Sequence, residues 1–368
     1  RCMSHRFSIR PTIAEDAPGL SELLSDTPQE GSIQLNFERE PNYFHATDVG
    51  TTTRDLWVME DTEQHRIAGA FSMGFRDVFE NGQRKSMRYG SDLRIHRDYQ
   101  GGRTLLRFFK TVKSLIGSDN YQTVILEENK ASLDTVGGNR IKVQPTYNAF
   151  RRHRTNMIEL HRREKHVINL NIRRATSADI PTMQAFFDAN APKKQFYPCY
   201  DFSRVETGDS YYRDIKLNDF LLAFEGDELV GMTGFWDQKA FKQTRIAGYS
   251  KAIQYARPFY NAYTKIAGGL SLPPAGSLTS YIYLHCNVFK DNRSDIFADL
   301  LAYARKELKD SEYDALVVGF DTEDPLQKVT DKYKKEELFS LHFICGYGDD
   351  PTPDLNPEGL MYLETARL

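Results

Sequence analysis

The sequence lacks the features that mark several large classes of protein. Its 368 residues contain only four cysteines, and no two of them form a CxxC pair: Cys2, Cys199, Cys286 and Cys345. No histidine cluster at metal-ligand spacing accompanies them, so the sequence predicts neither a disulfide framework nor a zinc site. The longest apolar runs are far below the roughly 18 residues of a membrane-spanning helix. We therefore expect a cytoplasmic protein without a membrane partner.

A strong excess of charge of either sign is also absent. The chain has 48 lysines and arginines against 51 aspartates and glutamates, a net charge of −3. This balance argues against a dedicated nucleic-acid-binding protein. The basic run Arg-Arg-His-Arg at residues 151–154 is the local exception. It could bind phosphate, but a solvated strand or contacts with acidic side chains within the protein are the favoured interpretations.

The most informative stretch covers residues 92–106, where a strand-like run breaks at a Gln-Gly-Gly turn and restarts as a helix. Apolar residues recur at helical spacing over residues 105–116, and Gly117 ends the pattern. The first amides of a helix have no partner within it and lie at the positive end of its dipole, so they bind phosphate groups. Gly101 and Gly102 would let the backbone approach such a ligand. An ordinary strand-to-helix turn is the alternative.

This stretch resembles the acyl-CoA site of the GNAT superfamily of N-acetyltransferases. Residues 93–95 are similar to the strand of that site, and Tyr99-Gln100-Gly101 to its turn. The family's further glycines are missing after Gly102; we interpret this as a shortened loop, the alternative being that other residues occupy the glycine positions and weaken the site. The resemblance implies that acyl-CoA contacts Leu93, Arg94, Ile95, Gln100, Gly101, Gly102, Arg103 and Thr104.

The resemblance also implies where proton transfer would occur. Asp92 lies where the central strand should diverge from its neighbour, and its carboxylate could accept a proton from an acceptor amine; helix capping or an ion pair is the alternative role. Glu127 follows the next strand and is the second catalytic candidate, while Asn129 is expected to contact the CoA arm. The family's usual general-acid tyrosine is missing, which leaves Tyr147 and Ser132 as distant candidates.

Two parts of the sequence are similar at a domain-sized spacing. Residues 7–16 show a short strand followed by a helix start, and the pattern recurs at residues 170–179. Arg173 follows Arg10 by 163 positions, and Asp179 follows Asp16 by the same number. Such a period indicates a duplicated domain rather than a solenoid. The sequence thus predicts an N-terminal GNAT-like domain at residues 1–163 and a C-terminal one at 164–368.

The second half has the poorer acyl-CoA site. Its corresponding strand, residues 280–288, leads into a helix without any glycine, and Ser294 or Asp295 could cap that helix. A carboxylate there would compete with phosphate, so we interpret this half as degenerate. It carries an insertion at residues 238–278. Aromatic residues in and before this insertion could line a substrate groove, but are more typical of packing: Phe235, Trp236, Tyr249, Tyr255, Phe259 and Tyr260.

These observations predict an α/β protein with a mixed α+β sheet, built from two consecutive GNAT-like acyl-CoA N-acyltransferase domains. The expected activity is transfer of an acetyl or short acyl group from acetyl-CoA, or another acyl-CoA, to a primary amine, without a metal. The acceptor could be a small molecule or a peptide, and a homo-oligomer is possible. The alternative is a non-catalytic CoA-binding or structural protein with degenerate folds, because a fold does not fix a function.

Overall fold

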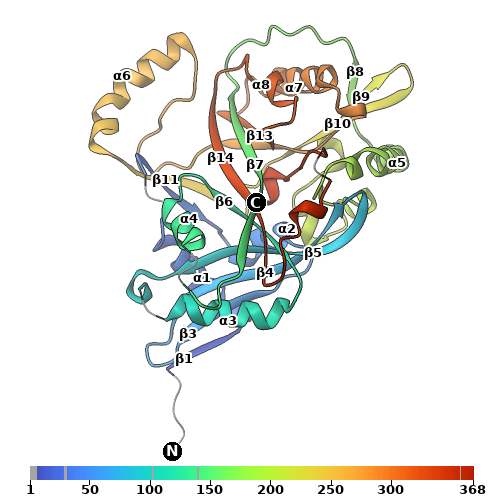
Figure 1. Cartoon of the computed structure of the whole chain (residues 1–368). Helices are drawn as coiled ribbons and strands as arrows, with labels where there is room; N and C mark the ends of the chain where they lie inside the picture. The colour runs from blue at the N-terminus through green and yellow to red at the C-terminus, as the bar shows by residue number, and fades with distance from the viewer. Residues whose placement is uncertain (1–5, 29–30, 102, 139–140, 357) are drawn as a thin grey trace, which may run out of the picture.

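The chain forms one long, twisted mixed sheet with helices on both faces (Figure 1). The computed structural model describes residues 6–28, 31–101, 103–138, 141–356 and 358–368. From one edge to the other, the twelve strands are β1 (Phe7–Pro11), β3 (Leu56–Asp61), β4 (Arg66–Glu80), β5 (Gln83–Ile95), β6 (Tyr121–Leu126), β14 (Lys335–Gly346), β7 (Thr146–Glu159), β13 (Ala315–Asp321), β12 (Tyr281–Phe289), β10 (Glu228–Trp236), β9 (Phe220–Glu225) and β8 (Asn171–Arg174).

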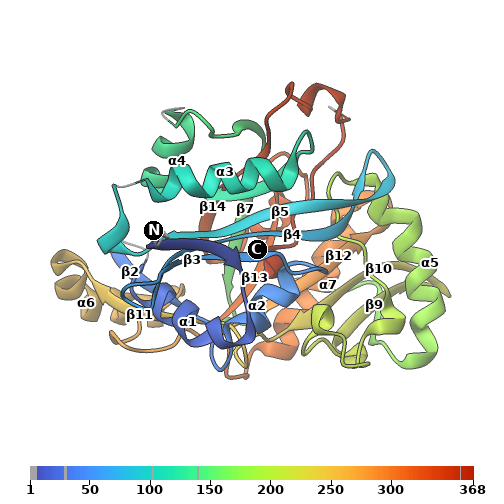
Figure 2. The same ribbon diagram turned by 90° about the horizontal axis from the view of Figure 1, so that it is seen from below.

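Helices cover the first half of this sheet on both sides. Figure 2 shows α3 (Thr104–Ile116) and α4 (Lys130–Gly137) on one side of β4 and β5, and α1 (Ala17–Ser25) and α2 (Tyr43–Gly50) on the other. The apolar face predicted for residues 105–116 packs into a core with Phe71, Met73 and Tyr121. In the second half the helices are α5 (Ile180–Asn190), α7 (Ser294–Leu308) and the short α8 (Gln327–Thr330).

The insertion of the second half lies between β10 and β12. It contains β11 (Gln243–Tyr249) and α6 (Lys251–Ala267). β11 pairs with β2 (Ile33–Glu38) of the first half in a separate two-stranded sheet, and α6 extends from this sheet as an arm (Figure 1). The insertion therefore connects the two halves of the sequence.

The repeat predicted from the sequence has matching local structure. Arg10 forms two hydrogen bonds to Asp16, at 2.8 and 2.9 Å, and Arg173 forms the same pair to Asp179, at 2.9 and 2.7 Å. In each case the acidic side chain also accepts the amide three residues before it, which fixes the start of the following helix. The mixed α/β sheet and tandem arrangement agree with the predicted fold class, while the boundary at residue 163 stays a prediction.

The two halves exchange their last strands. β7, from the first half of the sequence, pairs with β13 of the second half. β14, from the end of the second half, pairs with β6 of the first half, and β7 and β14 pair with each other. The twelve strands therefore form one continuous sheet, in which each half of the sequence relies on a strand from the other half as a neighbour.

Both halves contain a place where two parallel strands diverge. β5 pairs with β6 only from Arg88 to Gly90, and beyond that point the two strands pair with different neighbours. We call this divergence the first splay. β12 and β13 likewise pair only from Tyr281 to Tyr283, and we call their divergence the second splay.

A β-bulge lies just beyond the start of each splay. Two residues of β5, Asp92 and Leu93, face one residue of β4, and Asp92 has φ +56°. In β12, Cys286 and Asn287 face one residue of β10, and Cys286 has φ +53°. Such a bulge adds a residue and re-aims the neighbouring side chains and amides. The V-shaped divergence expected between the central strands is thus present in both halves.

No helix in the described parts of the chain combines the length and the apolar composition needed to cross a membrane.

Candidate active site

The first splay leads to a helix whose N-terminus carries no side-chain cap. Arg103 is the N-cap residue of α3, its side chain makes no capping hydrogen bond, and it is exposed. Gly101 has φ +75°, and a Cβ built there would meet no atom within 4 Å. Gly102 lies outside the described residues. The start of this 13-residue helix thus presents amide donors to an open loop, which is the geometry expected for a phosphate site.

The remaining loop residues hold the turn in shape. The Gln100 side-chain amide donates to the carbonyl of Ile95 at 3.0 Å. Thr104 is buried, and its hydroxyl donates to the carbonyl of Tyr99 at 3.3 Å. These contacts fix the strand-to-helix connection that the sequence predicted.

The strand ends at the first splay are only partly covered. Leu93 is 46% exposed, Arg94 and Ile95 are half-buried, and the last four residues of β6 are half-buried too. Arg94 donates to the hydroxyl of Thr27, just after α1, at 3.3 Å. From Ser91 onward, the edge of β5 that faces β6 pairs with no strand in the described parts of the chain. An extended ligand can therefore lie along this edge by pairing with the backbone.

Asp92 lies at the bulge in a bidentate ion pair. Its carboxylate accepts two hydrogen bonds from the guanidinium of Arg39, at 2.8 and 2.7 Å, and its side chain is 9% exposed. Burial alone would raise the pKa of Asp92, but the charge and hydrogen bonds of Arg39 outweigh it and hold that pKa below its usual value. The structure thus gives Asp92 the ion-paired form that the sequence left as an alternative. A catalytic role for Asp92 stays a prediction.

A lysine from the second half completes the surroundings of Asp92. Lys242 lies just before β11, and its ammonium donates to the carbonyl oxygen of Leu368 at 2.6 Å. Lys242, Asp92 and Arg39 line the same small cavity, about 40 Å³ in volume. Burial, together with the positive charge of Arg39, lowers the pKa of Lys242 to about 8. Sequence reasoning missed this residue, because a lone lysine in an insertion has no motif around it.

The other two predicted residues lie at the outer end of β6. Glu127 accepts hydrogen bonds from Arg152 at 2.5 and 2.8 Å, and this contact lowers the pKa of its carboxyl. Asn129 is the N-cap of α4, where its side-chain oxygen accepts the amide of Ser132 at 3.1 Å. Glu127 therefore has a different ion-pair partner from Asp92. Its catalytic role and the contact of Asn129 with CoA both stay predictions.

In the second splay, by contrast, every residue of both diverging strands beyond the paired segment is buried. The carboxylate of Glu364 accepts the amide of Cys286, the bulge residue, at 2.8 Å. The hydroxyl of Tyr362 accepts the side-chain amide of Asn287 at 3.0 Å, and the Tyr362 ring stacks on Tyr197 with centroids 4.0 Å apart. Residues of the chain's own last segment thus occupy the second splay.

The helix after the second splay also differs from α3. Ser294 and Asp295 open α7, and the N-cap residue Arg293 makes no side-chain capping bond. Asp295 lies in the first turn, where Arg293 donates to it and lowers its pKa; amides at the helix start contribute to the same shift. The sequence predicted that Ser294 or Asp295 could cap this helix; instead Arg293 is the N-cap residue and the Asp295 carboxylate lies in the first turn, so its competition with a phosphate stays a prediction.

Comparison with known proteins adds to this geometry. No family description and no curated protein sequence matches the chain. Among solved structures, Saccharomyces cerevisiae N-myristoyltransferase with bound myristoyl-CoA matches over 100% of this chain and 84% of its own, with a TM-score of 0.61 and 9% identity. A GCN5-related N-acetyltransferase from Sphaerobacter thermophilus matches over 94% of this chain and 98% of its own, with a TM-score of 0.54 and 11% identity.

The chain has the tandem GNAT fold. A second N-acetyltransferase of this type, from Anabaena variabilis, matches over 92% of this chain and 72% of its own, with a TM-score of 0.50 and 11% identity. At such identities the likeness shows the fold alone. The neighbours in fold are acyltransferases, and this agrees with the superfamily resemblance of residues 92–106.

Within this GNAT fold, the distant general-acid candidate Tyr147 lies near the first splay. Tyr121 packs under Gly90, where the two strands separate, because a Cβ on Gly90 would lie 2.7 Å from the Tyr121 ring. The Tyr121 hydroxyl donates to that of Tyr147 at 3.5 Å, and burial raises the pKa of both groups. Ser132, the other candidate, lies on α4.

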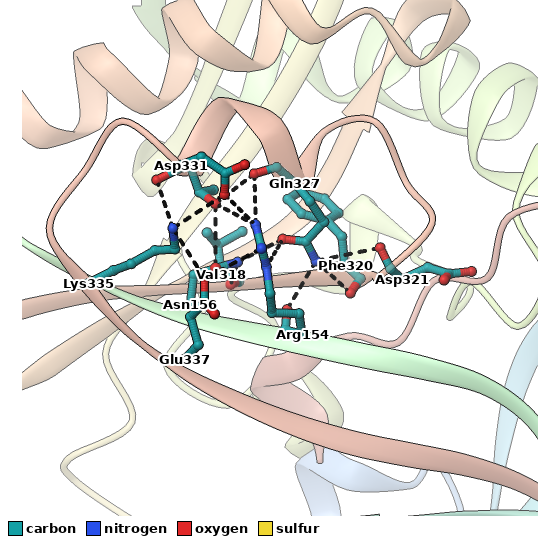
Figure 3. A network of polar contacts seen from close by, with 10 residues as sticks. Arg154, Asn156, Val318, Phe320, Asp321, Gln327, Asp331, Lys335 and Glu337 are labelled. Atoms are coloured by element: carbon teal, nitrogen blue, oxygen red, sulfur yellow. Dashed lines mark hydrogen bonds and ion pairs between the residues drawn. The ribbon is translucent and has the colours of Figure 1, made fainter.

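The basic run at residues 151–154 forms contacts within the protein. Figure 3 shows the Arg154 side chain in a network in which it donates to Gln327 at 2.8 Å and to Asp331 at 3.0 Å. Arg151 pairs with Glu323, and Arg152 with Glu127. The favoured interpretation, contact with acidic side chains, is confirmed for these three arginines.

Cys199, Cys286 and Cys345 are free and buried. Among the described residues, no group of three or more His, Cys, Asp and Glu side chains is placed to hold a metal ion.

Proposed function

We propose that the protein transfers an acetyl or other short acyl group from acyl-CoA to a primary amine at the first splay. The observation that carries this proposal is a partly exposed pair of diverging strands that leads to a 13-residue helix with no side-chain cap. Acyltransferases share the fold, and one of them is N-myristoyltransferase with bound myristoyl-CoA. The second splay would not take part, because the chain's own residues occupy it.

The proposed cosubstrate would lie across the loop and the unpaired strand edge. Its pyrophosphate would accept hydrogen bonds from amides of Gly101, Gly102, Arg103 and Thr104 at the start of α3. Gln100, whose own backbone amide donates to the carbonyl of Arg97, would shape the turn. Its extended arm would pair with the free edge at Leu93, Arg94 and Ile95, with Asn129 on the opposite side. The cavity beside Asp92, about 40 Å³, favours a short acyl group over a long chain.

The proposed reaction places the amine beside Asp92 and Lys242. The Asp92 carboxylate attracts the ammonium, but its lowered pKa makes it a weak proton acceptor. Lys242, with a pKa of about 8, is partly neutral near pH 7.5 and takes the proton. The neutral amine then attacks the thioester carbonyl, the C–N bond forms and the C–S bond breaks. The attacking nitrogen loses a second proton, and the CoA thiolate takes up one proton to leave as the thiol. Glu127, which pairs with Arg152 and does not line the cavity beside Asp92, has no part in this step, and its role stays a prediction.

Calorimetric titration with acetyl-CoA tests the cosubstrate site. We expect one site per chain and binding at least about tenfold weaker in Arg103→Glu, since a negative charge at the helix N-terminus repels the pyrophosphate. Arg103→Gln is the matched control, and its loss should be smaller. Two sites per chain would show that the second splay binds CoA, and no site would remove the proposal.

Release of free thiol in the presence of amines tests the transfer itself. A panel of polyamine, amino-sugar and N-terminal peptide amines should include at least one that releases thiol from acetyl-CoA. Lys242→Met should bind acetyl-CoA with unchanged affinity but slow this release about 100-fold or more, by the usual size of acid–base catalysis. Binding without thiol release from any amine would leave a CoA-binding module in place of an enzyme.

A further inference from the structure

One face of α6 exposes a row of large apolar side chains. Tyr255 is 80% exposed, Phe259 80%, Tyr263 61% and Ile266 83%. Their spacings of four, four and three residues put them on one side of the helix. Of the eight exposed large hydrophobic residues in the described chain, four lie on this helix face. Exposed apolar side chains are therefore clustered here, and such clusters mark interaction sites.

The opposite face of α6 is already held by its own loop. The side-chain amide of Asn261 donates to the carbonyl of Leu272 at 2.8 Å, and its oxygen accepts the Leu272 amide at 2.8 Å. Thr264 is buried, and its hydroxyl lies 3.1 Å from that of Ser271. The helix therefore keeps its position without using the aromatic row, which the fold of this chain leaves uncovered.

The stretch of sequence that contains this row carries charge of one sign. Between Asp237 and Asp291 the sequence contains no acidic residue but seven lysines and arginines, although the whole chain has a net charge of −3. Lys239 and Arg245 pair with acids outside this stretch, and Lys242 lies in the candidate active site. Lys251 and Lys265, near the two ends of α6, are exposed and have no acidic partner among the described residues.

We propose that α6 is a docking helix that lies flat on an anionic lipid surface. An interfacial helix places aromatic and aliphatic side chains among the lipid headgroups and extends flanking lysines toward anionic groups, and α6 has both features on adjacent sides. A protein partner would need a groove to fit this protruding arm (Figure 1). The inference is independent of acyl transfer. It revises the expectation that no membrane is a partner, which rested only on the lack of a membrane-spanning segment.

Co-sedimentation of the full chain with vesicles tests this proposal. We expect binding to vesicles of phosphatidylcholine with 30% phosphatidylserine. The triple variant Tyr255→Ser/Phe259→Ser/Ile266→Ser should lose at least about tenfold in affinity. Replacing Lys251 and Lys265 by glutamine should cost up to about thirtyfold, and 0.5 M salt should weaken the wild type similarly.

A matched control removes exposed apolar side chains elsewhere. Ile13→Ser/Val167→Ser changes residues that are 54% and 73% exposed, and it should bind vesicles like the wild type. Thermal unfolding should be unchanged in all variants, because none of the side chains is buried. Absent binding to the anionic vesicles would overturn the proposal, as would equal binding by the α6 triple variant. So would a wild-type dimer that this variant converts to a monomer, since a second copy would then cover the face.

Discussion

The two splays have the same backbone and opposite contents. Each has a short parallel pairing, a bulge with one residue at positive φ, and a helix that follows. In the first, the bulge residue Asp92 pairs with Arg39, and the strand ends stay partly exposed. In the second, the amide of Cys286 binds Glu364, and the strand ends are buried. The two splays therefore share a backbone geometry, but only in the second do side chains of the same chain occupy the space between the strands.

The filling of the second splay also shapes the first. The segment that delivers Tyr362 and Glu364 continues to Arg367, whose buried guanidinium donates to the carbonyl of Val49 at 2.7 Å. Arg76 of β4 donates back to the carbonyl of Arg367 at 3.0 Å. Arg367 also lines the small cavity beside Asp92. Through this segment and Lys242, the second half of the sequence therefore contributes residues to the surroundings of the first splay.

Replacement of the bulge residue in the first splay should lower stability much more than replacement of the bulge residue in the second. Asp92→Asn leaves the Arg39 guanidinium without its ion pair in a site where both side chains are less than 15% exposed. We expect a loss of about 3 kcal/mol in the free energy of unfolding, measured by urea denaturation. Cys286→Ala, the equivalent change in the second half, should cost only about 1 kcal/mol.

Removal of both partners separates the ion pair from other causes. The double variant Arg39→Met/Asp92→Asn should recover part of the stability lost in Asp92→Asn, because no charge is then left unpaired. Equal losses in Asp92→Asn and Cys286→Ala would contradict the difference that we describe between the bulges.

The filled splay should give stability a pH dependence of its own. Burial raises the pKa of Glu364 to about 7 from its ordinary 4.5, so the folded state keeps this proton after the unfolded state has lost it. The contribution of this raised pKa to the free energy of unfolding is full below pH 4.5 and is lost as the pH rises through about 7. The wild type should lose about 3 kcal/mol across this window relative to Glu364→Gln. Parallel stability curves for the two proteins would argue against this assignment.

The smallest effect should come from the start of α7. Asp295→Asn removes the carboxylate from the helix N-terminus, and this exposed change should alter stability by less than about 1 kcal/mol. Because Tyr362 and Glu364 still occupy the second splay, acetyl-CoA titration should give the same single site per chain. A second site in this variant would show that Asp295 alone blocks the cosubstrate.

Local patterns in the sequence predicted much of the fold. The apolar spacing at residues 105–116 and Gly117 predicted α3 within one residue, because helix periodicity and its end signals are local. The Arg10–Asp16 and Arg173–Asp179 pairs showed the repeat for the same reason. The Gln-Gly-Gly turn predicted the place of the candidate phosphate site, and Gly101 is as open there as expected.

Contacts between distant residues were beyond this kind of reasoning. Lys242 and Asp92 come from different halves and meet only because β11 pairs with β2. Glu127 follows its strand as predicted, but its partner Arg152 comes from a strand whose position could not be predicted. The filling of the second splay by Tyr362 and Glu364 depends on a terminal segment without a motif. Each of these follows from tertiary packing, which a local pattern does not encode.

The exchange of β7 and β14 limits when the sheet can be completed during synthesis. β6 needs β14 as its neighbour, yet about 210 residues separate the two strands in the sequence. At about 5–20 residues per second, a ribosome needs roughly ten to forty seconds to produce that neighbour. Until β14 is made, the edge of β6 that it will pair with is unpaired, and such an edge can pair with other chains, so we expect the nascent chain to be prone to aggregation until then.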